Sequence, residues 1–185
     1  MEIIEKALKF ASQAHDGQFR KSTRIPYITH PAAVGMMLLK EGCRDEVVAA
    51  GLLHDTVEDT WTTLEEISEQ FGEDVAVIVE GCSEPDKTLS WESRKEHTIL
   101  FLKNASEDIR LVACADKLHN LRSIAMDHME EGEAVWERFN RGRDKQEWYY
   151  RSLADSLGHQ SDFPLLEELR KEIRKLFGGE DPTAK

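Results

Sequence analysis

The stretch Gly51-Leu52-Leu53-His54-Asp55-Thr56-Val57-Glu58-Asp59-Thr60 decides how the rest of the chain is interpreted. It continues an apolar run and then places four ionisable side chains, those of His54, Asp55, Glu58 and Asp59, within six positions. On a helix, residues three and four apart share a face, so Glu58 would lie one turn beyond both His54 and Asp55. At about 100° per residue, the four side chains would fan over roughly 140° of one helix.

An adjacent His-Asp pair at the end of an apolar helix is costly to bury, because buried charges need a partner or a metal ion. A divalent cation would neutralise the carboxylate of Asp55 and hold the imidazole of His54. The alternative is a helix that simply turns polar as it leaves the core. Polar residues elsewhere in the chain are needed to distinguish these two interpretations.

The composition indicates an ordinary globular domain. A chain of 185 residues is long enough for one domain with a substantial core, and 40% hydrophobic with 32% charged residues excludes a disordered chain. The net charge of −12 argues against broad binding to nucleic acid or to an anionic membrane, which requires a basic face. A small phosphorylated ligand needs only a local cluster of Arg and Lys.

The cysteines and the amino terminus favour the cytoplasm. Cys43, Cys82 and Cys114 are widely spaced, without a Cys-x-x-Cys pair, as expected for thiols in a reducing compartment. The first residues form an acidic amphipathic segment and not a signal sequence. No apolar run is long enough to span a bilayer. The sequence does not decide the oligomeric state.

Helical periodicity runs through most of the chain. The β-branched run Val75–Val79 would suit a strand, but no partner strand is present, so we expect a buried helix there. The aromatic residues between Gly132 and Gly158 are interpreted mainly as helix packing. We therefore predict an all-α fold with a single domain over residues 1–178 and a frayed tail over 179–185. The other expected helices cover about residues 3–14, 31–39, 45–60, 63–71, 98–102, 107–121 and 164–177.

Two further segments carry polar side chains that could either face solvent as an ordinary loop or helix cap or contribute to a site. A loop with the cations Arg20, Lys21 and Arg24 precedes His30-Pro31, where proline suits the first turn of a helix. Cations in a loop beside a metal ligand would favour an anion-binding site. Farther along, an apolar helix ends in Asp116, His119 and Asn120 on one face, and a buried Asp116 would need a cation or a basic partner.

His30, His54, Asp55 and Asp116 together form a candidate metal site. Mixed nitrogen and oxygen ligation suits Mn²⁺, Fe²⁺, Zn²⁺ or Mg²⁺ better than a soft metal. A metal held in this way could acidify a bound water and polarise a phosphoryl oxygen. Glu58 and Asp59 follow the ligands by one turn, where a general acid or base is needed.

This set of residues resembles the HD-domain metal-dependent phosphohydrolases, whose ligand order is His…His-Asp…Asp. Three blocks of the sequence are similar to the hydrolase domain of the RelA/SpoT alarmone enzymes, and the resemblance covers about residues 1 to 160. The blocks are Arg20-Lys21-Ser22 with Pro26-Tyr27-Ile28-Thr29-His30-Pro31, then Leu53 to Thr60, and Ala115-Asp116-Lys117-Leu118-His119-Asn120-Leu121-Arg122. The segment Tyr150 to Gly158 is similar to the stretch that closes that domain.

The resemblance implies hydrolysis of guanosine 3′-diphosphate 5′-di- or triphosphate, (p)ppGpp, to GDP or GTP and pyrophosphate, usually with Mn²⁺. It implies that Glu58 and Asp59 activate the water or handle protons. Arg20, Lys21 and Asn120 match positions that contact the nucleotide. Longer family members continue into a synthetase domain at the point where this sequence ends. We therefore expect a stand-alone small alarmone hydrolase. The implied metal ligands are His30, His54, Asp55 and Asp116.

Two segments depart from the family pattern, namely 138–148 and the region around Lys87, Trp91 and Arg94. Both could line the base and 5′-phosphate end of the pocket, so the substrate is less certain than the reaction. One alternative is the same chemistry on an adenosine alarmone or on the 2′-phosphate of NADPH. Another is a nucleotide sensor without catalysis. A purely structural helical protein would leave the polar blocks unexplained.

Overall fold

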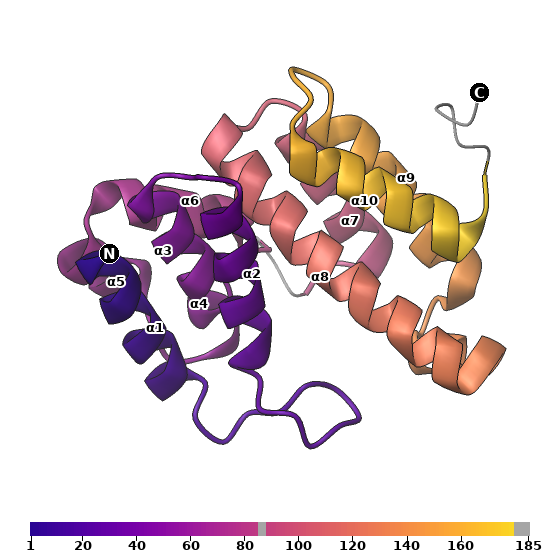
Figure 1. The fold of residues 1–185 in the computed structure, drawn as a ribbon, viewed down its shortest axis with the longest axis horizontal. Coiled ribbons are helices and arrows are strands. Elements are labelled where there is room, and N and C mark those ends of the chain that lie inside the picture. Colours follow the sequence, from indigo (N-terminus) through magenta and orange to yellow (C-terminus); the bar gives the residue numbers. More distant parts are fainter. Residues whose placement is uncertain (85–87, 180–185) are drawn as a thin grey trace. The chain divides into compact units, whose positions relative to one another are not determined.

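The computed structural model describes residues 1–84 and 88–179 (Figure 1). Over these residues the regular elements are helices, and the one β feature is an isolated bridge between Phe19 and Pro26. The predicted all-α class is therefore confirmed. The elements are α1 Glu2–Ala14, α2 Thr29–Lys40, α3 Asp45–Leu53, α4 Thr56–Asp59, α5 Leu64–Phe71, α6 Glu73–Cys82, α7 Trp91–Leu102, α8 Glu107–Glu131, the 3₁₀ helix η1 Gly132–Arg138, α9 Gly142–Leu157 and α10 Pro164–Phe177.

The chain divides into two compact units, which are described separately below. The first comprises Met1–Lys87 and Ala105–Asp116, and the second comprises Thr88–Asn104 and Lys117–Lys185. A single domain over 1–178 remains a prediction. Of the predicted tail, residues 180–185 lie outside the described part of the chain, as does Lys87.

In the first unit, α3 is the central helix and packs against α1, α2 and α6. Its residues from Val47 to Leu53 are all buried. Gly51 and Gly35 allow α3 and α2 to approach closely, since a Cβ at Gly51 would overlap the Leu38 side chain. The short connection between α2 and α3 makes the two helices antiparallel neighbours. The start of α2 and the end of α3 therefore lie at the same end of the pair.

The predicted single helix over 45–60 is wrong in one respect. Helix α3 ends at Leu53 and α4 begins at Thr56, so His54 and Asp55 lie in the break. The His54 side chain bonds the Gly51 carbonyl oxygen at 2.8 Å, and the Thr56 hydroxyl donates to the Leu53 carbonyl oxygen at 2.7 Å. Side chains that bond backbone carbonyls in this way compete with regular helix formation.

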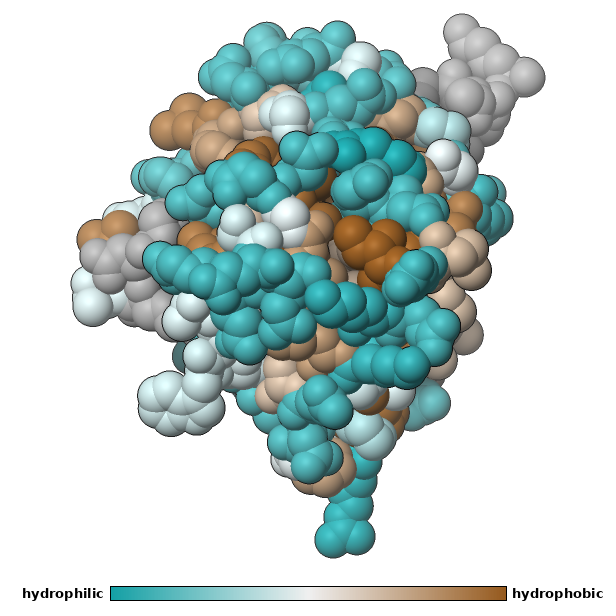
Figure 2. All heavy atoms as spheres, turned by 90° about the vertical axis from the view of Figure 1, so that its left-hand side faces the viewer, coloured by the Kyte–Doolittle hydropathy of each residue, from teal (hydrophilic) through white to brown (hydrophobic). Residues whose placement is uncertain are grey.

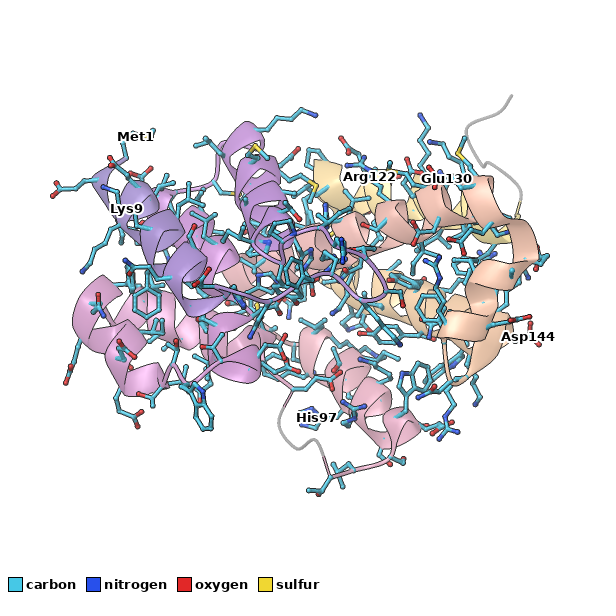
Figure 3. All side chains as sticks on the ribbon, turned by 90° about the horizontal axis from the view of Figure 1, so that it is seen from below. Met1, Lys9, His97, Arg122, Glu130 and Asp144 are labelled. Atoms are coloured by element: carbon cyan, nitrogen blue, oxygen red, sulfur yellow. The ribbon has the colours of Figure 1, made fainter. Side chains whose placement is uncertain are left out.

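In the second unit, α9 packs against α7, α10 and η1. Trp136, Tyr149 and Tyr150 are buried there, as expected for most of the aromatic residues in this region, whereas Trp148 retains 36% exposure. Arg122, labelled in Figure 3, donates to Glu168 at 2.6 Å and so joins α8 to α10. Helix α8 continues to Glu131, beyond the predicted end at residue 121.

Figure 2 shows one face of the molecule, where hydrophilic side chains predominate and hydrophobic ones reach the surface in small separate groups. Met1 directly precedes α1, and Lys9 on that helix points outward (Figure 3) and pairs with Glu5 at 2.7 Å. Among the described helices, none is both long enough and apolar enough to cross a membrane.

Candidate metal centre

Three of the four predicted ligands form a compact cluster in the first unit. His30 lies in the first turn of α2, His54 follows α3, and Asp116 lies on α8. One ligand atom from each residue can be chosen so that all three lie within 4.8 Å of one another, and all three residues are buried. The Nε2 atoms of His30 and His54 lie 3.2 and 3.8 Å from Asp116 Oδ1.

Asp55, the fourth predicted ligand, faces the same two imidazoles. Its Oδ2 atom lies 3.2 Å from His54 Nε2 and 3.5 Å from His30 Nε2. The structure therefore brings two imidazole nitrogens together with an oxygen from each of two carboxylates.

The hydrogen bonds of His54 leave one ring nitrogen directed at this cluster. Its Nδ1 atom lies 2.8 Å from the Gly51 carbonyl oxygen, which can only accept, so Nδ1 carries a hydrogen. Its Nε2 atom is buried and has no hydrogen-bond partner among the described residues, although Asp55 Oδ2 is 3.2 Å away. A backbone carbonyl that fixes the tautomer and exposes the other nitrogen is the usual outer contact of a metal-binding histidine. The donor set and this orphaned nitrogen fit a divalent cation.

The electrostatics of the cluster are those of a cation site. Burial alone lowers the pKa of His54, but the charges of Asp55 and Asp116 outweigh it and raise that pKa to about 9. Burial raises the pKa of Asp55, but the interactions with the neighbouring His54 and the charge of His30 together lower it by a larger amount. The pKa of Asp55 therefore lies well below its usual range. In the absence of a metal, a proton on His54 balances the Asp55 carboxylate. A cation would take over this role.

The predicted Glu-Asp pair occupies α4 with two different environments. Glu58 is half-buried and its Oε2 accepts a hydrogen bond from the Glu84 amide at 3.3 Å. Asp59 is exposed, and its Oδ2 lies 3.4 Å from the Tyr27 hydroxyl, which itself donates to Asp55 at 2.7 Å. Asp59 is thus connected to the cluster through Tyr27.

The predicted cationic loop is a tight hairpin beside Tyr27. The Arg20 amide donates to the Ile25 carbonyl at 2.9 Å, and Ser22 adopts the left-handed conformation with φ of 61°. The Arg20 guanidinium carbon lies 5.6 Å from the centre of the Tyr27 ring. Lys21 is exposed. The proposed nucleotide contact Asn120 and its neighbour His119 lie on the part of α8 that belongs to the second unit, and the role of Asn120 remains a prediction.

Described residues from the two segments that depart from the family pattern come together within the second unit. The Trp91 ring centre lies 6.1 Å from that of Trp148 and 6.1 Å from that of Tyr149. Lys145 lies 5.6 Å over the Trp148 ring, and Lys95 lies 5.0 Å over the Tyr149 ring. Aromatic rings with adjacent cations are suited to bases and phosphates. Arg141 also pairs with Glu92 at 3.1 Å, which joins the same two segments.

Sequence reasoning assigned no role to Tyr27, although the structure places its hydroxyl against a predicted ligand. The available signal was its spacing. Tyr27 precedes His30 by three residues at the entry to α2, about one helical turn.

Comparison with known proteins gives a consistent result. A family model described as HD domain matches residues 7–144. The guanosine-3′,5′-bis(diphosphate) 3′-pyrophosphohydrolase MESH1 of Xenopus tropicalis is 45% identical over 125 residues, which cover 66% of this chain and 69% of the relative. The guanosine-3′,5′-bis(diphosphate) 3′-pyrophosphohydrolase of Aquifex aeolicus is 41% identical over 66% of this chain, but the match covers 18% of that longer relative. A probable GTP pyrophosphokinase of Mycobacterium leprae is 39% identical over 67% of this chain, and this match covers 16% of that relative.

Two solved structures share the fold over most of this chain. The crystal structure of a Listeria monocytogenes EGD-e protein has a TM-score of 0.76 at 38% identity and covers 81% of this chain and 99% of that protein. A metazoan orthologue of SpoT, described as hydrolysing ppGpp, has a TM-score of 0.81 at 29% identity, with 95% and 96% of the two chains covered.

Proposed function

The chain belongs to the HD-domain family, and on this premise we propose that it hydrolyses (p)ppGpp to GDP or GTP and pyrophosphate in a metal-dependent reaction. The observation that carries the proposal is the buried cluster of His30, His54 and Asp116, with Asp55 at 3.2 Å from His54. The 3′-pyrophosphohydrolase names of relatives at 41–45% identity support the substrate.

We propose Mn²⁺ as the cation, with His30, His54, Asp55 and Asp116 as its ligands. The HD-domain family implies a divalent metal, and the imidazole and carboxylate donors suit Mn²⁺ as well as other borderline or hard ions. When bound, the ion would lower the pKa of a water molecule and withdraw charge from a phosphoryl oxygen.

The remaining chemistry falls to side chains of the chain itself. Hydrolysis forms a bond between the water oxygen and the phosphorus on the 3′-oxygen, breaks the bond from that phosphorus to the 3′-oxygen, and returns a proton to the sugar. Glu58 and Asp59 are proposed to accept the proton of the water and to supply the one that the leaving oxygen requires. Arg20, Lys21 and Asn120 are proposed to bind the nucleotide, as cations and an amide can for phosphate oxygens.

A second candidate keeps the reaction and changes the nucleotide. The aromatic and cationic cluster around Trp91, Trp148 and Lys145 in the second unit favours it, since these residues belong to the segments that depart from the family pattern. An adenosine alarmone or the 2′-phosphate of NADPH would offer the same ribose edge. A sensor without catalysis is less well supported, because it leaves Glu58 and Asp59 without a role.

A pyrophosphate-release assay with ppGpp tests the proposal, run with Mn²⁺ and with chelator. NADPH and an adenosine alarmone are assayed in parallel, with phosphate release measured for NADPH. Cleavage of ppGpp that requires Mn²⁺ is the expected result, and discrimination is compared through kcat/KM. Metal-loaded protein that leaves ppGpp intact would overturn the assignment, and cleavage of another nucleotide would select the second candidate.

Two further expectations remain part of the proposal. We propose one hydrolase domain over residues 1–178, since the HD-domain match at 7–144 includes residues of both compact units. We also propose a cytoplasmic location, supported by the spacing of the three cysteines.

A further inference from the structure

Tyr27 touches three parts of the candidate site at once. Its hydroxyl donates to Asp55 Oδ2 at 2.7 Å and lies 3.4 Å from Asp59 Oδ2. Its ring centre lies 6.0 Å from that of His30 and 5.6 Å from the Arg20 guanidinium carbon. A candidate ligand, a candidate proton-transfer group and a candidate nucleotide-binding cation therefore all contact one side chain.

The hydroxyl group is a fixed donor to Asp55. A phenol has one hydrogen to give, and the 2.7 Å distance to Asp55 describes a strong hydrogen bond, whereas 3.4 Å to Asp59 describes a weak one. Burial raises the pKa of Tyr27 far above its ordinary value, and the negative charge of Asp55 raises it further. The side chain is therefore a neutral donor near neutral pH, as an ordinary phenol also is.

The position of the ring is itself determined by neighbours. The His15 ring centre lies 4.9 Å from that of Tyr27, and His15 Nδ1 lies 2.8 Å from Gln18 Oε1. Gln18 accepts a hydrogen bond from the Tyr27 amide at 2.9 Å and donates from Nε2 to the Asp59 carbonyl at 2.8 Å. The end of α1, the start of the hairpin and the end of α4 are thus joined around Tyr27.

The oxygen that Tyr27 contacts is the one directed at the cluster. Asp55 Oδ2 is also the atom 3.2 Å from His54 Nε2 and 3.5 Å from His30 Nε2. A hydrogen bond to this oxygen restricts rotation of the carboxylate and holds Oδ2 toward the imidazoles. Outer contacts of this kind orient metal ligands, and their removal typically weakens metal affinity by about 10- to 100-fold.

We propose that Tyr27 is a positioning residue with two separable roles. Its hydroxyl holds Asp55 in the orientation that binds the cation, and its ring holds Arg20 beside the same centre. The inference rests on the proposed function for the identity of the cation and the nucleotide, but the hydroxyl role can be measured by metal binding alone.

The first test compares Mn²⁺ binding by wild type and Tyr27→Phe, using calorimetric titration without nucleotide. Phenylalanine keeps the ring contacts with His15, His30 and Arg20, so the fold should be preserved. We expect Mn²⁺ affinity to fall by about 10- to 100-fold. Activity should recover at saturating Mn²⁺, and KM for ppGpp should stay unchanged. Wild-type Mn²⁺ affinity in Tyr27→Phe would overturn the proposal.

A second variant isolates the ring. Tyr27→Leu removes both the hydroxyl and the surface under Arg20, so it should show the same loss of Mn²⁺ affinity together with a KM raised by about two- to fivefold, the usual strength of an exposed cation–π contact. A KM equal to that of Tyr27→Phe would remove the ring from the proposal.

Thr29→Val is the matched control. Thr29, the first residue of α2, donates from its hydroxyl to the Pro26 carbonyl at 2.8 Å, a bond of similar length close to Tyr27 that involves no predicted ligand. The Mn²⁺ affinity of Thr29→Val should equal that of wild type, and an equal loss in both variants would show a general effect on the entry to α2 and contradict the proposal. If wild type binds Mn²⁺ but leaves ppGpp intact, the proposed function fails while the binding comparison still decides the role of the hydroxyl.

Discussion

The imidazole of His54 bonds through Nδ1 to the carbonyl oxygen of Gly51, 2.8 Å away and three residues earlier in the chain. This contact places Nε2 in the buried cluster and also engages a carbonyl oxygen of the last turn of α3. The same interaction thus orients a proposed ligand and competes with the helix that precedes it.

His54→Ala and Asp55→Ala should each abolish metal occupancy and hydrolysis together. Each substitution removes a donor from a cluster whose Nε2 and Oδ2 atoms lie 3.2 Å apart, and Asp55→Ala also leaves His54 without its nearest countercharge. Metal content after dialysis and the pyrophosphate-release rate measure the two effects. His159→Ala, which alters an exposed histidine of the second unit, should retain the metal. Metal retained in Asp55→Ala would remove Asp55 from the ligand set.

Glu58→Gln should leave the metal bound and slow turnover by about 10²–10⁴-fold, the range for loss of a general acid or base. Glutamine preserves the size of the side chain and its ability to accept the bond from the Glu84 amide. Metal content and kcat are measured on the same preparation. Loss of the metal in this variant would identify Glu58 as a ligand and contradict the role proposed for it.

Metal affinity should increase as the pH rises toward 9. Without a metal the pKa of His54 is about 9, so a proton occupies the imidazole near neutral pH and has to leave when a cation binds. Apparent affinity should therefore rise by about tenfold per pH unit and level off above the pKa.

Calorimetry in two buffers with different ionisation enthalpies would measure this proton release directly. About one proton should be released per ion bound near neutral pH, and none well above pH 9. Affinity that stays constant between pH 7 and 9 would show that His54 is not the protonated group.

Gly51→Ala should destabilise the first unit, because the added Cβ would overlap the Leu38 side chain between α3 and α2. Overpacking of a core typically costs about 1–3 kcal/mol. Thermal unfolding measures this loss, and Mn²⁺ titration should show weaker binding as well, since His30 lies in α2 and His54 directly follows α3. An unchanged unfolding temperature would mean that α2 and α3 can separate at little cost.

Most of the helices could be predicted from the sequence because apolar periodicity and capping residues are local. The buried run Val75–Val79 is helical, as the absence of a partner strand suggested. The N-cap of α5, the helix that precedes this run, is less clear from the sequence. The sequence predicts a capping box of Thr62 with Glu65, but Thr63 is the cap and accepts the bond from the Glu66 amide, so that prediction is wrong by one residue. Adjacent threonines offer the same chemistry, and only packing selects one.

The approach of His30, His54, Asp55 and Asp116 was anticipated from their residue types, since isolated buried carboxylates and imidazoles are costly. The break between α3 and α4 was not, because it depends on hydrogen bonds from His54 and Thr56 to backbone carbonyls. The contact of Tyr27 with Asp55 spans 28 residues, and no local pattern specifies it.

The break between α3 and α4 also coincides with the close approach of two neighbouring side chains, those of His54 and Asp55. On a regular helix, adjacent side chains point about 100° apart, which would direct His54 and Asp55 to different surroundings. Here their Nε2 and Oδ2 atoms lie 3.2 Å apart. A designer who transplants this centre into another helical scaffold would therefore have to copy the interrupted turn, including the Gly51 carbonyl and the Thr56 hydroxyl, and not the ligand spacing alone.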